Sequence, residues 1–103
     1  MTEAVHVRTS RTSGEAHVAI TGEVDLSTAD AVLHELERAI EGCAVAIVDL
    51  SEVTYIDSRG IRLLVQVARG LREHGGRFTV IAPKETVAGG VLRLTHVDEL
   101  ELD

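Results

Sequence analysis

A run of apolar residues that leads almost directly into an amphipathic helix constrains this 103-residue chain more than any other feature. Val45 to Val48 are all apolar and Asp49 follows them, which predicts a strand buried on both faces, as in the centre of a parallel sheet. From Ser58 onward, apolar residues recur at helical spacing. They are Ile61, Leu64, Val65, Ala68 and Leu71. The pattern predicts a strand, a short loop and a helix, with Asp57-Ser58-Arg59-Gly60 at the junction.

The residues before this unit predict a hairpin and a helix. Apolar and polar residues alternate over Ala4 to Thr9 and again over Glu15 to Thr21, as expected for two half-exposed strands. A helix follows over residues 29–40, because apolar residues recur at helical spacing there. Ser27 or Thr28 is expected to cap its start, and Gly42 to end it.

The residues after the unit predict a strand, a helix and a short strand. Arg77 to Ala82 alternates with Phe78 and Val80 inward. Pro83 is expected to open a helix that runs to about Thr95, with Val87, Val91 and Leu94 on its apolar face. His96 to Leu102 is the last strand candidate.

The resulting order of elements, ββαβαβαβ, predicts an α/β fold. We expect a mixed sheet of four to five strands. If successive strands step the same way across this sheet, right-handed crossovers place the helices mainly on one of its faces. We expect one domain over residues 1–103, because a chain of this length buries a single core.

Composition narrows the classes of function. The net charge of −7 argues against nucleic acid as a partner. The single cysteine, Cys43, cannot form an internal disulfide, which suits a reducing compartment. The N-terminus lacks the pattern of a signal peptide, and no apolar run approaches membrane-spanning length. We therefore expect a cytoplasmic protein with no membrane contact. The five histidines lack metal-ligand spacing, so neither a metal nor a cofactor is expected.

Ser58 is the candidate functional residue, and two interpretations of it stay open. It could simply cap the helix, as serines often do. Alternatively, a hydroxyl at a helix N-terminus is a suitable place for phosphate, because the amides of residues 58–60 point outward there. An enzyme is the competing class, but the sequence around Ser58 is not Gly-x-Ser-x-Gly and no histidine is placed as its base, so we expect no catalytic residue.

Two motifs carry a resemblance to a known family. Gly22-Glu23-Val24-Asp25 precedes the first predicted helix, and Asp57-Ser58-Arg59-Gly60 begins the second. In this order, on this element pattern, the chain resembles the STAS-domain anti-sigma factor antagonists over nearly its whole length. Family members usually continue into a further C-terminal helix, whereas this chain stops at Leu100-Glu101-Leu102-Asp103.

The resemblance implies a function. An unphosphorylated antagonist binds an anti-sigma factor that is also a serine kinase, and a sigma factor is thereby released for transcription. Phosphorylation of the motif serine switches the antagonist off. In this chain the motif residues are Asp57, Ser58 and Gly60, and the phosphorylated serine is Ser58. A PP2C-type phosphatase is then a further expected partner. The alternative is a STAS adaptor subunit of a transporter or signalling assembly.

The resemblance also implies a contact surface, formed by the loop from Asp25 through Ser27 to Thr28 and by the start of the second helix. Arg59 and Arg62 lie on the polar face of that helix with Gln66 and Arg69. This basic stripe either meets acidic residues of a partner or is an ordinary solvated face.

Overall fold

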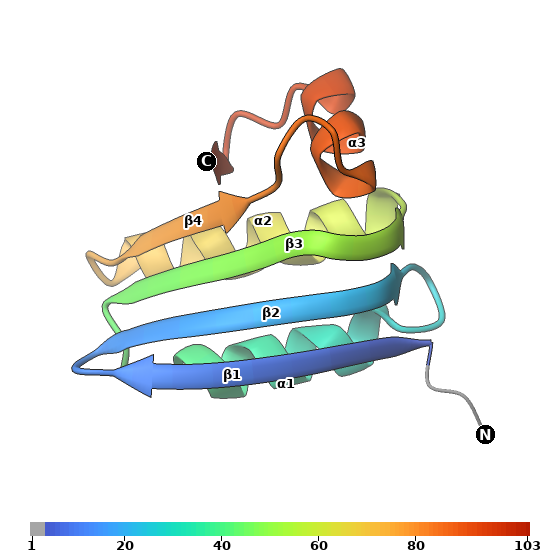
Figure 1. The fold of residues 1–103 in the computed structure, drawn as a ribbon. Helices are drawn as coiled ribbons and strands as arrows, with labels where there is room; N and C mark the ends of the chain where they lie inside the picture. Colours follow the sequence, from blue (N-terminus) through green and yellow to red (C-terminus); the bar gives the residue numbers. More distant parts are fainter. Residues whose placement is uncertain (1–3) are drawn as a thin grey trace.

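The computed structural model describes residues 4–103 as one mixed sheet with two helices packed on one side (Figure 1). The strands are β1 (Val5–Thr12), β2 (Glu15–Val24), β3 (Val45–Ile56), β4 (Arg77–Ile81) and β5 (Glu101–Leu102), and the helices are α1 (Ala29–Ile40), α2 (Ser58–Glu73) and α3 (Val87–Thr95). The sheet order is β1-β2-β3-β4-β5, with β1 antiparallel to β2 and all other neighbours parallel. The predicted fold class and element order are confirmed.

The core lies between the sheet and the helices α1 and α2. Alternate residues of each strand point into it, among them Val18 of β2, Val48 of β3 and Phe78 of β4, all at most 1% exposed. Leu36 of α1 and Leu64 of α2 meet them from the helical layer and are equally buried. Within residues 4–103, no helix combines the length and apolarity needed to cross a bilayer.

The central strand differs from its prediction in length and in burial. β3 continues through Asp49 to Ile56, and its register against β2 shifts twice along the way. Asp49 supports the first irregularity, because its carboxylate accepts hydrogen bonds from the Ser51 amide (2.9 Å) and hydroxyl (2.6 Å). The prediction of burial on both faces is wrong: Ala46 and Val48 are buried, whereas Val45 and Ile47 are only half-buried on the face that lacks helices.

The C-terminal elements also differ from their predictions. Thr86, not Pro83, caps α3, and the Thr86 hydroxyl accepts a hydrogen bond from the Gly89 amide (3.1 Å). The buried residues of α3 are Ala88, Gly89 and Leu92. Of the predicted apolar face, Val91 packs against the core, whereas the prediction is wrong for Val87 and Leu94, which are exposed. The helix packs beside the second half of β3, beyond the end of β4 (Figure 1). The last strand is confined to Glu101–Leu102.

Candidate functional site

The two motifs singled out in the sequence meet at the carboxyl ends of β2 and β3. The Asp57 amide donates a hydrogen bond to the Val24 carbonyl oxygen (3.2 Å), which ties the start of α2 to the end of β2. Side chains from the β2–α1 loop and from the β3–α2 junction line one surface hollow of about 690 Å³. Its lining residues are Glu23, Asp25, Leu26, Ser27, Thr54, Tyr55 and Asp57.

Asp57, not Ser58, caps helix α2. Its backbone is extended, and its carboxylate accepts hydrogen bonds from the Arg59 amide (2.9 Å) and the Gly60 amide (3.2 Å). Ser58 is the first residue of the helix and is exposed. The prediction of a Ser58 cap was wrong because two residues with capping side chains stand in succession, and the backbone geometry selects the first.

The same hydrogen bonds revise the expected phosphate donors. The amides of Arg59 and Gly60 are already paired with the Asp57 carboxylate. A phosphate on Ser58 would therefore compete with a carboxylate for these amides, and the two anions would repel each other.

Gly60 is required for packing at this junction. A Cβ atom on Gly60 would lie 2.7 Å from the Val24 carbonyl oxygen and 2.8 Å from Cγ1 of Ile56. The start of α2 therefore sits directly on the ends of β2 and β3, and only glycine allows this approach. The position of Ser58 relative to the β2–α1 loop depends on this contact.

The β2–α1 loop is held together by Asp25 and Thr28. The Asp25 carboxylate accepts hydrogen bonds from the Ser27 hydroxyl (2.8 Å) and amide (2.9 Å) and from the Thr28 amide (3.2 Å). The hydrogen bond from the Ser27 hydroxyl is the main reason that the pKa of Asp25 lies below its usual value. Asp25 is therefore a carboxylate at neutral pH.

Thr28 has an internal role rather than a surface one. It is 7% exposed, and its hydroxyl donates to the Glu23 carbonyl oxygen (2.7 Å) and accepts from the Asp25 amide (3.0 Å). Thr28 stands at the N-cap position of α1 without making a side-chain capping bond. It shapes the loop that presents Asp25 and Ser27, and it is too buried for direct contact with a partner.

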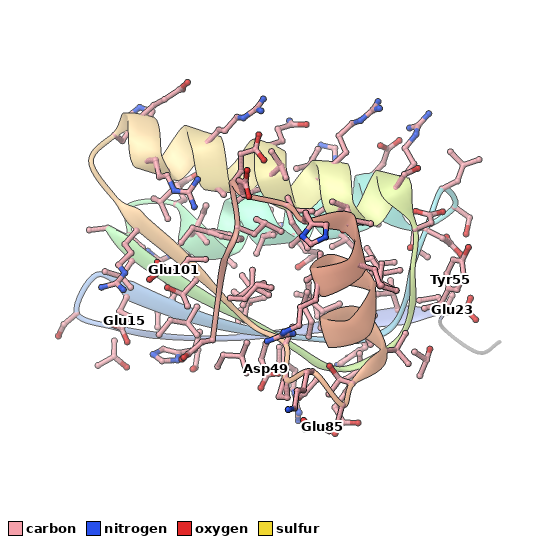
Figure 2. The ribbon with its side chains drawn as sticks, turned by 90° about the horizontal axis from the view of Figure 1, so that it is seen from above. Glu15, Glu23, Asp49, Tyr55, Glu85 and Glu101 are labelled. Atoms are coloured by element: carbon pink, nitrogen blue, oxygen red, sulfur yellow. The ribbon has the colours of Figure 1, made fainter. Side chains whose placement is uncertain are left out.

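Two exposed apolar side chains at the site were missed in the sequence. Leu26 is 67% exposed and Tyr55 is 50% exposed, and both line the hollow. Tyr55 lies opposite Glu23 on the neighbouring strand, and both residues are at the same end of the sheet (Figure 2). The signal that could have found Leu26 is its place between two polar loop residues, where a core leucine is not expected.

The basic stripe of α2 is exposed but divided. Arg59 and Arg62 are exposed near the start of the helix, next to Ser58. Arg69 is two turns further along and forms an ion pair with Glu99 (2.8 Å), which lowers the pKa of that glutamate. Only the first part of the stripe is therefore near the candidate site. Among residues 4–103, His, Cys, Asp and Glu side chains form no group of three or more that could hold a metal ion.

Comparison with solved structures gives matches over almost the whole chain. The anti-sigma factor antagonist SpoIIAA in its unphosphorylated form is 18% identical, with a TM-score of 0.75 over 95% of this chain and 88% of that chain. An anti-sigma factor antagonist from Mycobacterium paratuberculosis is 22% identical, with a TM-score of 0.77 over 95% of this chain and 84% of that chain. The Bacillus cell fate determinant SpoIIAA in its phosphorylated form is 16% identical, with a TM-score of 0.70 over 95% of this chain and 91% of that chain.

At these identities the likeness establishes the fold, and the sequence itself supplies the family. Residues 7–102 match a family model described as Mlab, STAS domain. The match includes both motifs, all five strands except the first residues of β1, and all three helices. The chain belongs to the STAS-domain family, and its fold is that of the anti-sigma factor antagonists.

Proposed function

We propose that this protein is an anti-sigma factor antagonist and that phosphorylation of Ser58 switches it off. In this proposal the unphosphorylated protein binds an anti-sigma factor that is also a serine kinase, and the bound sigma factor is released for transcription. The similarity of the fold to SpoIIAA, known in phosphorylated and unphosphorylated forms, supports the class of function.

The observation that carries the proposal is the exposure of Ser58 beside a surface suited to a protein partner. Ser58 is exposed and is not needed as the cap of α2, because Asp57 has that role. Leu26 and Tyr55 are exposed and line the same hollow as Asp57, the residue that precedes Ser58, so a partner can bury them as aromatic and aliphatic anchors are buried in many interfaces. A serine in this position is accessible to a kinase active site without unfolding of the domain.

The proposed switch acts through charge at the interface. A phosphoserine adds about −1.5 to −2 charge at neutral pH. The Arg59 and Gly60 amides are paired with Asp57, so the phosphate would meet the partner instead of folding back onto the helix. Bringing a doubly charged group into a close interface is unfavourable unless it is paired there. We therefore expect phosphorylation to reduce affinity and leave the fold unchanged.

Incubation with the cognate anti-sigma factor kinase and ATP tests the site. We expect one phosphate per chain, mapped to Ser58 by mass spectrometry, and no labelling of Ser58→Ala. Ser10→Ala is the matched control, because Ser10 is an exposed serine on β1, away from the motif, and its replacement should leave labelling unchanged. Labelling of Ser58→Ala at the parent's level would refute the assignment.

A further inference from the structure

The sheet has an open face that the helices do not cover. β2, β3, β4 and β5 run parallel, and parallel sheets are normally packed on both faces, yet α1 and α2 lie on the same side (Figure 1). Figure 2 shows both helices above the sheet and Asp49 on the opposite side. Ile47 and Ile81 are half-buried on this open face, and both line two adjoining hollows of about 320 and 430 Å³.

The strand register aligns the outward side chains of this face in rows across the sheet. One row contains Glu15, Val45 and Arg77, on β2, β3 and β4. Two residues further along the strands, the next row contains Ser10, His17, Ile47, Thr79 and Glu101. The third row contains Arg8, Ala19, Asp49 and Ile81. β3 is the middle strand in each row, so the rows can be compared on either side of it.

We propose that this open face binds the same face of a second copy of the chain, about a two-fold axis parallel to β3. This axis places β3 over β3 of the second copy and β2 over its β4. Each row of side chains therefore faces the same row of the second copy, read in the opposite direction across the sheet. Arg77, which pairs with Glu101 of its own chain (2.6 Å), then lies opposite Glu15 of the second copy, which pairs with its own His17 (2.6 Å). Ile81 lies opposite Ala19 of the second copy. Val45 and Ile47 meet their own counterparts on the axis. The face is thus complementary to itself in charge and in apolar contact, as an isologous interface requires.

The other in-plane two-fold axis, perpendicular to the strands, lacks this complementarity. It exchanges the first and third rows, so that Glu15 would face Ala19 of the second copy and Arg77 would face Ile81. Glu101 would also face its own counterpart. Arg77 and Glu15 keep their partners within the chain, Glu101 and His17, about either axis. Only the axis parallel to the strands adds an oppositely charged group of the second copy, whereas the other axis removes hydration from both side chains without that gain. The axis parallel to the strands is therefore favoured.

One like-charge contact remains in the proposed dimer, because Asp49 lies on the axis and faces Asp49 of the second copy. Its carboxylate is already turned along its own strand, where it accepts from the Ser51 amide and hydroxyl. Replacement by asparagine would keep an accepting oxygen for these bonds and remove the repulsion. Asp49→Asn is therefore expected to strengthen the dimer, which a purely structural role for Asp49 would not predict.

Sedimentation equilibrium of the full chain tests the proposal at roughly 10 µM to 1 mM, because a small, partly polar interface is expected to be weak. We expect a monomer–dimer equilibrium for the parent. Arg77→Glu and Glu15→Arg should each weaken dimerisation at least about tenfold, because each places like charges opposite one another. The double variant restores both opposite-charge contacts between the copies and the net charge, but it places an acidic side chain at position 77 beside Glu101 of the same chain. It should therefore dimerise more tightly than either single variant without reaching the affinity of the parent.

Arg38→Glu is the matched control. Arg38 is exposed on α1, on the other side of the sheet, and its reversal changes the net charge as much as Arg77→Glu does. It should leave dimerisation unchanged, and circular dichroism melts should show that all variants are folded. A parent that stays monomeric up to 1 mM would overturn the proposal. A dimer that responds equally to Arg38→Glu and Arg77→Glu, or whose double variant is not rescued, would overturn it as well. Neither outcome bears on the role proposed for Ser58.

Discussion

Replacing Gly60 by alanine tests the packing that positions the candidate site. The added Cβ would lie 2.7 Å from the Val24 carbonyl oxygen, 2.8 Å from Ile56 Cγ1 and 2.9 Å from Val24 Cγ1. Overpacking of this kind typically costs about 1–3 kcal/mol. The upper part of that range applies, because one of the contacts is a backbone oxygen, which also accepts the Asp57 amide and cannot simply rotate away.

Part of this cost is offset by helix propensity, since alanine is favoured over glycine inside a helix by about 1 kcal/mol. The net expectation for Gly60→Ala is a loss of roughly 1–2 kcal/mol of unfolding free energy. For a domain of this size each kcal/mol shifts Tm by about 4–8 °C. Calorimetry or a circular dichroism melt is sensitive enough to measure the decrease.

Gly70→Ala supplies the matched comparison in the same helix. A Cβ on Gly70 would have no heavy atom within 4 Å, so the change in stability comes only from the higher helix propensity of alanine. This variant should gain about 0.5–1 kcal/mol. The same chemical change is therefore expected to have opposite signs at the two positions. An increase in Tm for both variants would show that α2 does not sit on the ends of β2 and β3 as closely as described.

Substitutions at three further positions test other parts of the fold. Asp57→Ala removes the cap of α2 and should cost about 0.5–2 kcal/mol in a thermal melt, whereas Asp57→Asn should cost less. Val48→Asp should abolish a cooperative unfolding transition, because an unpaired charge would replace a fully buried side chain in the central strand. A hydrogen bond from Arg69 lowers the pKa of Glu99, so the stabilising effect of this carboxylate should be present at neutral pH and lost as the pH falls below the ordinary glutamate range and through the lowered pKa. Urea melts at pH 7 and pH 3 should accordingly show a deficit for Glu99→Gln at pH 7 that shrinks at pH 3.

The order of helices and strands could be predicted because the spacing of apolar residues and the positions of turn residues indicate the same elements along most of the chain. Alternation in β1, β2 and β4 and helical spacing in α1 and α2 each follow from burial on one face only. The position of Ser58 at the start of α2 also followed from its sequence, since a polar junction separates the strand from the helix. These features depend on local pattern, which a single sequence contains.

The features that were missed depend on tertiary contacts. β3 continues past Asp49 because that side chain bonds to Ser51 within the strand, while polarity alone suggests an end. α3 buries Ala88, Gly89 and Leu92 and leaves Val87 and Leu94 exposed. Gly89 sets this face, because it lies against the Pro83 carbonyl and no side chain fits there. The cap of α2 likewise depends on backbone geometry at Asp57, which the succession of two capping residues leaves open.

We propose that Ser58 is a switch in a binding surface rather than a structural residue. Calorimetric titration of the anti-sigma factor kinase into the parent, Ser58→Ala and Ser58→Asp tests it most directly. Thermal melts of the three proteins should be similar, because Asp57 provides the cap in each. Ser58→Ala is expected to bind like the unphosphorylated parent, and Ser58→Asp to bind at least about tenfold more weakly, a difference of about 1.4 kcal/mol. Equal affinities for the alanine and aspartate variants, or binding that merely follows their stabilities, would contradict the account.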